Sequence, residues 1–161
     1  MCSVLYKYAS SYGGIREIAG PVHNEGIVAM LRRWAPWIRT DEDAWCAAFI
    51  AHCCAAIGIK LPLTDVGRIR AASYMDVGAK VYHKGVMGKL PAAEDDRNMI
   101  AVVKRKDGGY HVTIWGGYGM KYVNGEYVVD NGTMVGLGGN QSNRVGLDRY
   151  SVDEVVCVCA V

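Results

Sequence analysis

The sequence predicts an α+β domain in which helices from the first half pack on one face of an antiparallel sheet formed by the second half. Up to about residue 90, apolar residues recur at helical spacing, and beyond it they form short β-rich runs. Eleven of the twenty glycines fall between Gly108 and Gly146, as expected where tight turns join antiparallel strands. We therefore expect one domain over 1–161, with a helical half at about 1–90 and a β half at about 91–161.

The first half contains three clear helical segments and a weaker one. The first has apolar residues at helical spacing over 4–12 and ends at two glycines, and the second follows Asn24, a residue type that favours the N-cap. The third is the most regular, with apolar residues recurring over 45–57 and Gly58 as its stop. The weaker candidate covers 66–75.

The second half is predicted to form strands joined by glycine-rich turns. Apolar and β-branched runs at 99–103 and 110–115 are the first two strands. Tyrosines and valines on both sides of Asn124-Gly125 predict a hairpin with a two-residue turn. A last strand is expected over 155–161.

Composition and charge exclude several classes of protein. Apolar residues make up 51% of the chain and charged residues 21%, which suits a folded core and not a disordered chain. The net charge of +2 gives no electrostatic reason to expect nucleic-acid binding. The longest apolar stretch, 44–59, is too short to span a bilayer, and the first residues lack the pattern of a signal peptide. We therefore expect synthesis in the cytoplasm and no membrane insertion.

The six cysteines are expected to be free thiols. Cys53 and Cys54 are adjacent, Cys157 and Cys159 alternate on one predicted strand, and there is no CxxC pair. A disulfide framework is typical of secreted chains too small to build a core. Since the histidines show no ligand spacing with the cysteines, we also expect no metal site and no cofactor.

Cys46 differs from the other cysteines because it lies where the third predicted helix begins. Unpaired N–H groups and the dipole at a helix N-terminus lower the pKa of a thiol and can stabilise an oxyanion. If Asp43 caps this helix, Cys46 lies in its first turn. Cys46 is therefore a candidate nucleophile, and its alternative role is that of a small core residue.

A nucleophilic cysteine needs a base, which can come from anywhere in the sequence. His111 is the best-placed histidine because it follows a glycine turn and opens a β-rich segment. His52 lies on the apolar stripe of the Cys46 helix and is expected to be a core histidine. His83 has no clear role in a loop-like stretch, and His23 is either structural or part of a substrate site.

The base in turn needs a residue that orients its ring. The segment "LGGNQSN" offers Asn140, with Gln141 as the alternative, although such a segment is also typical of a simple turn. Trp45 and Tyr110 flank the two candidate catalytic residues in sequence. We consider Trp45, Tyr110 and Gln141 as candidates for substrate binding, with core packing as the alternative for the aromatic pair.

Over about residues 5–150 the sequence resembles phage and prophage cell-wall hydrolases of the CHAP type (cysteine- and histidine-dependent amidohydrolases/peptidases), a papain-like group. The resemblance rests on the order of four motifs, "EIAGPVHNEGIVAML", "DEDAWCAAFIAHCCAAIGIKLP", "YHVTIW" and "LGGNQSNRV". The WC-x-x-F junction with GGNQ downstream is its most specific part.

The resemblance implies a papain-like fold in which the cysteine begins a helix packed against an antiparallel sheet. Carried over by position, Cys46 is the nucleophile, His111 the general base and Asn140 the orienting residue, and the backbone N–H of Cys46 forms part of the oxyanion hole. It implies an endolysin-like peptidoglycan hydrolase, made in a host bacterium, that cuts an amide bond in the peptide part of the cell wall. We expect a monomer that needs no cofactor, with a holin as a candidate partner.

The chain departs from the family at several points, and two other roles stay open. Tyr110 precedes the histidine where many relatives have glycine, "NMIAVVKRK" replaces a strand with a Gly-Asp pair, and no calcium-binding motif is evident. We expect no separate cell-wall-binding domain. The alternatives are a secreted antibacterial amidase toxin held in check by an immunity protein, and a non-catalytic phage or cell-wall protein on the same scaffold.

Overall fold

A computed structural model describes residues 3–92 and 95–161 as an α+β fold on one seven-stranded antiparallel sheet, which confirms the predicted class. The helices are α1 (Val4–Ser10), α2 (Glu25–Arg32), α3 (Cys46–Ala56) and α4 (Asp65–Arg68), with 3₁₀ helices η1 (Ala71–Asp76) and η2 (Val152–Glu154). The strands are β1 (Ala79–His83), β2 (Met87–Gly88), β3 (Met99–Lys104), β4 (Tyr110–Val123), β5 (Glu126–Gln141), β6 (Arg144–Ser151) and β7 (Val155–Ala160).

Local signals in the sequence explain several helix ends. The Asn24 side chain accepts hydrogen bonds from the backbone N–H groups of Gly26 and Ile27, which confirms the predicted cap of α2. Gly58 follows α3 with φ +81°, a conformation that glycine adopts without strain, and it ends the helix as predicted. The predicted helix at 66–75 is wrong in detail, because the chain forms the short α4 and then η1.

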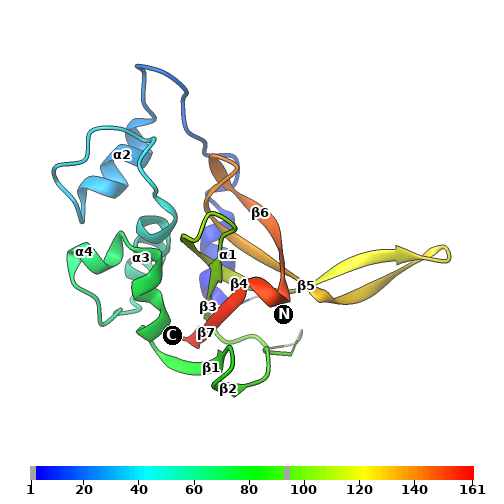
Figure 1. The fold of residues 1–161 in the computed structure, drawn as a ribbon. Helices are drawn as coiled ribbons and strands as arrows, with labels where there is room; N and C mark the ends of the chain where they lie inside the picture. Colours follow the sequence, from blue (N-terminus) through cyan, green and yellow to red (C-terminus); the bar gives the residue numbers. More distant parts are fainter. Residues whose placement is uncertain (1–2, 93–94) are drawn as a thin grey trace.

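The strand order is β2-β1-β7-β3-β4-β5-β6. The hairpin predicted at Asn124-Gly125 is confirmed: both residues have positive φ, and β4 and β5 pair on either side of them. These two strands are much longer than predicted, and their paired ends project away from the rest of the molecule (Figure 1). The first strand begins at residue 79, so the predicted boundary near residue 90 is wrong, because β1 and β2 lie before it.

The sheet has two buried faces. On one face, Val112 and Ile114 of β4 pack with residues of α1, α2 and α3 in the main core. On the other face, Trp115 packs with Met134 and with residues of β3 and β7, without any helix. Side chains alternate along a strand, so the helices cover only the first face, as predicted. We call these the helix face and the open face.

Within the described residues, no helix is both long enough and apolar enough to cross a membrane.

The five cysteines in the described part of the chain are free thiols. Cys157 and Cys159 lie side by side on β7, with their sulfur atoms 3.5 Å apart, and both contact the carbonyl oxygen of Met75. All five thiols are buried, so none is an exposed reactive group in this arrangement.

Candidate active site

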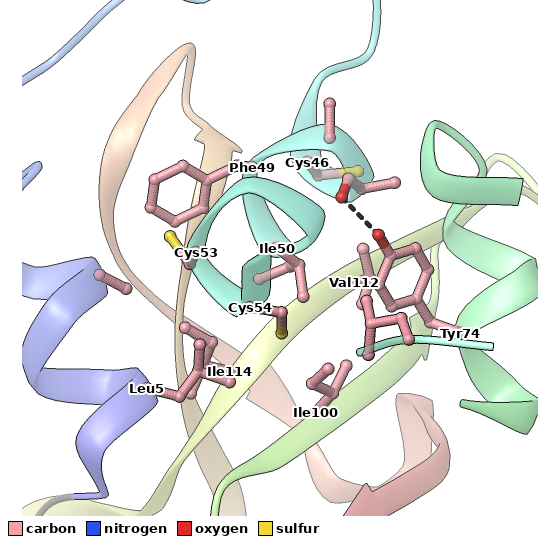
Figure 2. Packing of buried hydrophobic residues seen from close by; sticks show 14 of the residues in the cluster. Leu5, Cys46, Phe49, Ile50, Cys53, Cys54, Tyr74, Ile100, Val112 and Ile114 are labelled. Carbon is pink, nitrogen blue, oxygen red and sulfur yellow. Dashed lines mark hydrogen bonds between the residues drawn. The ribbon is translucent and has the colours of Figure 1, made fainter. Parts of the chain in front are cut away.

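Cys46 is the first residue of α3, which confirms its predicted position in the first turn. The predicted acidic cap is wrong. The N-cap is Trp45, without a capping side-chain hydrogen bond, and Asp43 instead accepts a hydrogen bond from the Thr40 hydroxyl. Figure 2 shows Cys46 at the start of α3, at the edge of the packed core that contains Val112. The thiol is nearly buried, with 6% of the residue exposed.

The surroundings of Cys46 act on its thiol in opposite directions. Burial raises the pKa of Cys46 because it removes water from the thiolate. Hydrogen bonds from the backbone N–H groups of Val112 and Ala47, and the positive charge of Arg105, act to lower it. Burial dominates, so the pKa stays above its ordinary value and the thiol is protonated at neutral pH in this arrangement.

His111 is the second residue of β4 and is 2% exposed. Its ring stacks on the Tyr150 ring of β6, with 5.9 Å between the centroids and 27° between the planes. Neither ring nitrogen has a hydrogen-bond partner among the residues the structure describes. Burial, and to a lesser extent the charge of Arg105, lowers the pKa of His111 to about 4, so the imidazole is neutral at pH 7.

The structure places Cys46 beside the strand of His111 but does not join their side chains. Val112 is on the helix face with Cys46, whereas His111, one residue away, stacks on Tyr150, which packs against the open-face cluster. The Cys46 sulfur is not a hydrogen-bond partner of either imidazole nitrogen. A catalytic pair therefore requires the imidazole to move from the arrangement described.

The two candidates for orienting the base lie in different surroundings. Asn140 has φ +54° and is half-buried at the end of β5, without a hydrogen bond to His111. Gln141 is 2% exposed, and its Nε2 donates to the hydroxyls of Thr113 and Tyr150, each at 3.0 Å. Its Oε1 is buried without a partner in the described part of the chain. Gln141 and His111 therefore share Tyr150 as a neighbour, and both retain unsatisfied buried polar atoms.

The candidate substrate-binding aromatic residues differ in exposure. Trp45 is fully buried, and its Nε1 donates to Glu17 Oε1 at 2.6 Å. Tyr110, at the start of β4, is 38% exposed. Trp45 and Gln141 are thus buried in this arrangement, whereas Tyr110 is accessible.

A hollow lies next to the start of α3. Its volume is about 480 Å³, and we call it the polar groove. The residues that line it are Glu17, Ala19, Glu42, Ala44, Arg105, Asn140 and Asn143. Ala44 is two positions before Cys46, and Arg105 acts electrostatically on both Cys46 and His111. The groove is therefore a space beside the start of α3 in which a polar ligand could approach the cysteine.

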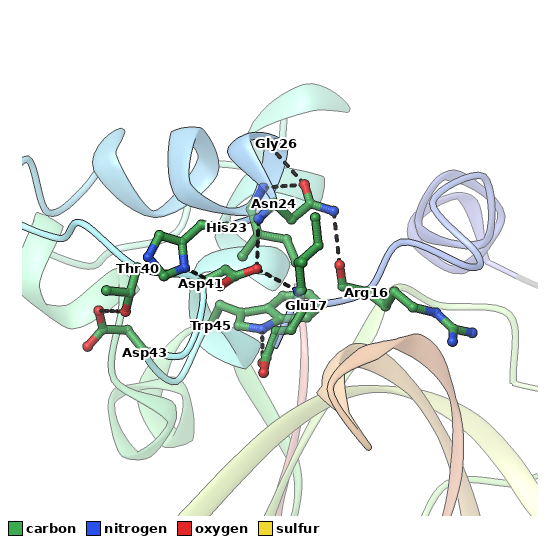
Figure 3. A network of polar contacts seen from close by, with 11 residues as sticks. Arg16, Glu17, His23, Asn24, Gly26, Thr40, Asp41, Asp43 and Trp45 are labelled. Atoms are coloured by element: carbon green, nitrogen blue, oxygen red, sulfur yellow. Dashed lines mark hydrogen bonds and ion pairs between the residues drawn. The ribbon is translucent and has the colours of Figure 1, made fainter. Parts of the chain in front are cut away.

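A buried histidine–carboxylate pair lies in the loops before α3, and the sequence analysis missed it. Asp41 is fully buried and accepts hydrogen bonds from His23 Nδ1 at 3.0 Å and from the backbone N–H groups of Ile18 and Asn24 (Figure 3). Burial alone would raise the pKa of Asp41, but these hydrogen bonds outweigh it and hold the pKa below its ordinary value. No local pattern indicates this pair, because the partners of Asp41 lie 17 to 23 positions away in sequence.

Within the described part of the chain, none of the remaining histidines forms a hydrogen bond with Cys46. His52 on α3 is a core histidine as predicted, since its Nε2 bonds to the Tyr12 hydroxyl at 2.8 Å. His83 is the last residue of β1 and not part of a loop. No group of three or more candidate metal ligands occurs in residues 3–92 and 95–161.

No protein-family model matches this sequence, and comparison with curated proteins and with solved structures finds no significant similarity. The α+β class and the antiparallel sheet are thus established by the geometry alone. The resemblance to CHAP-type hydrolases and the papain-like assignment stay predictions.

Proposed function

We propose that this chain is a cysteine amidase with a papain-like fold that hydrolyses an amide bond in the peptide part of peptidoglycan. Cys46 would be the nucleophile and His111 the general base, in the endolysin-like role that the sequence motifs imply. Gln141 or Asn140 would orient the base. The enzyme would act on the bacterial cell wall after synthesis in the cytoplasm.

One observation supports this proposal most strongly. Cys46 is the first residue of α3, where free backbone N–H groups can hold an anion, and it contacts the backbone of Val112, the neighbour of His111. A nucleophile at a helix N-terminus beside the strand that carries a base is an arrangement suited to acyl transfer. The polar groove gives a substrate an approach to this end of α3.

In the proposed reaction the His111 ring leaves Tyr150 and takes the proton of the Cys46 thiol. The thiolate forms a bond to the amide carbon, and the oxyanion is held by N–H groups at the start of α3. The C–N bond then breaks as His111 gives its proton to the leaving amine. Water, deprotonated by His111, attacks the acyl-enzyme and releases a carboxylic acid and the free thiol.

Loss of turbidity of purified cell walls tests the proposal directly. Cys46→Ala and Cys46→Ser should abolish it, because each removes the thiol that attacks the amide. Cys53→Ala is the matched control, since it removes another buried thiol of the same helix and should keep activity. Circular dichroism would verify folding, and a folded Cys46 variant with full activity would contradict the mechanism.

A second candidate function is a non-catalytic cell-wall-binding protein on the same fold. The observation that favours it is that the buried, protonated thiol of Cys46 forms no hydrogen bond with the neutral imidazole of His111. Iodoacetamide labelling separates the two candidates. A catalytic Cys46 should be labelled at pH 6–7 and lose this labelling in His111→Ala, because the histidine generates the thiolate. An inert core thiol should react only in strongly alkaline solution in both proteins.

A further inference from the structure

The polar groove carries charges of both signs that form no ion pair among the described residues. Glu17 and Glu42 line it together with Arg105, and none of the three takes part in an ion pair within the described residues. Unpaired charges that converge on one hollow indicate a charged or zwitterionic ligand. The groove is not an acidic cluster alone, because Arg105 and the amide side chains of Asn140 and Asn143 complete its walls.

Glu17 is held in place from two directions. Its Oε1 accepts the hydrogen bond from the buried Trp45 indole, and its backbone N–H donates to the carbonyl oxygen of Asn143 at 2.8 Å. The residue before Glu17, Arg16, also forms an isolated antiparallel bridge with Arg144 at the start of β6. The Glu17 carboxylate is thus fixed next to the residue that precedes Cys46, and its second oxygen has no partner among the described residues.

The charge of the polar groove is not uniform, because Arg105 lines it together with Glu17 and Glu42. The positive charge of Arg105 acts on Cys46 and His111, so this end of the groove disfavours a cation. An ammonium group in the groove is therefore directed to Glu17 and Glu42 and away from the thiol. A second hollow of about 330 Å³ shares Glu17 and Asn143 with the groove and is lined by Arg16 and Arg144, so cationic side chains line both hollows that meet at Glu17.

We infer that Glu17 and Glu42 bind a free ammonium group of the substrate, and that the enzyme selects wall peptides whose diamino acid carries an unblocked amine. This inference rests on the proposed function and names its substrate class. An ammonium–carboxylate contact of this kind should contribute about 10-fold to binding.

The experiment compares purified sacculi that have free stem-peptide amines with the same sacculi after N-acetylation, which removes the positive charge. Binding of Cys46→Ala protein to each is measured by sedimentation at low salt, and hydrolysis by the wild-type protein is measured in parallel. Acetylation should weaken binding about 10-fold. Glu17→Gln and Glu42→Gln should weaken binding to untreated sacculi and abolish the difference between the two wall preparations. Glu17→Gln keeps an oxygen for the Trp45 hydrogen bond.

Glu126→Gln is the matched control, because it removes the same charge at the far end of the projecting hairpin and should bind like the parent protein. Equal binding to acetylated and untreated sacculi, or no binding to untreated sacculi, would overturn the inference. If hydrolysis depends on Cys46 but not on acetylation, the inference fails and the proposed function stands. If binding depends on the amine but no bond is cut, the proposed hydrolysis fails and the amine site stands.

Discussion

The imidazole of His111 stacks on the ring of Tyr150, with 5.9 Å between the ring centroids, and the hydroxyl of that tyrosine accepts a hydrogen bond from Gln141. The three side chains come from three neighbouring strands, β4, β5 and β6. Two ring nitrogens and one amide oxygen in this group have no partner among the described residues. Unsatisfied buried polar atoms are costly, so a ligand or protonation that satisfies them can rearrange this group.

The depressed pKa of His111 predicts an acid-sensitive fold. A histidine with an ordinary pKa of 6.5 when unfolded and about 4 when folded stabilises the native state fully above pH 6.5. This contribution is lost as the pH falls from 6.5 to 4 and amounts to about 3 kcal/mol. Denaturant unfolding at several pH values should therefore show a smaller loss of stability for His111→Gln than for the wild-type protein over this range. An NMR titration midpoint near 6.5 for His111 would contradict the prediction.

Gln141 is expected to position His111, and Asn140 to have a lesser effect. Gln141→Leu removes the amide that bonds Thr113 and Tyr150, so it should lower the rate of wall hydrolysis by about 10-fold or more. Asn140→Ala, at the edge of the polar groove, should lower it only a few-fold. A change in the NMR titration of His111 in Gln141→Leu, absent in Asn140→Ala, would separate positioning from a general loss of stability. The opposite ranking would assign the orienting role to Asn140.

Asp41→Asn should destabilise the protein by roughly 2–3 kcal/mol, because the buried carboxylate accepts two backbone hydrogen bonds and one from His23. The matched control is Asp43→Asn, which changes an exposed carboxylate and should cost less than about 0.5 kcal/mol. Because the pKa of Asp41 is lowered on folding, its contribution is present above pH 4 and disappears as the pH falls through the folded value. Thermal unfolding at pH 7 compares the variants, and equal melting temperatures would contradict the prediction.

Gly139→Ala should separate α3 from the sheet. A Cβ atom at Gly139 would lie 2.4 Å from the Trp45 ring and 2.7 Å from Phe49 Cβ, too close for either side chain to remain in place. We expect a loss of roughly 2–3 kcal/mol and an increase in Trp45 fluorescence quenching by added iodide. Gly132→Ala is the control, since a Cβ there would meet Asp130 Oδ1 at an ordinary contact distance of 3.4 Å. If the two variants are equally stable, the packing described at Gly139 is wrong.

Features that depend on neighbours in sequence could be predicted. The cap at Asn24, the stop at Gly58 and the Asn124-Gly125 hairpin follow from the conformations that these residue types favour. β1 was missed because its sequence, "AKVYH", lacks an alternating apolar pattern and is defined by its pairing with β7 and β2. The cap of α3 was predicted wrongly because Asp43 had an alternative partner in Thr40.

The candidate site could be predicted only in part. The position of Cys46 at a helix start follows from local periodicity, and the structure agrees. The contact of His111 with Tyr150, and the Asp41–His23 pair, depend on segments that only folding brings together. No local pattern marks these pairs, because strand order and loop packing determine which side chains meet.

The place of β7 in the sheet bears on when this protein can become a stable fold. β7 lies between β1 and β3 and pairs with both, although it is formed by residues 155–160. A nascent chain that has left the ribosome only as far as residue 154 therefore has two unpaired strand edges where the middle of the sheet should be. Until residues 155–160 have been synthesised, these edges are templates for chaperones or for other chains, and the sheet can join β1 to β3 only after all the other strands have been made.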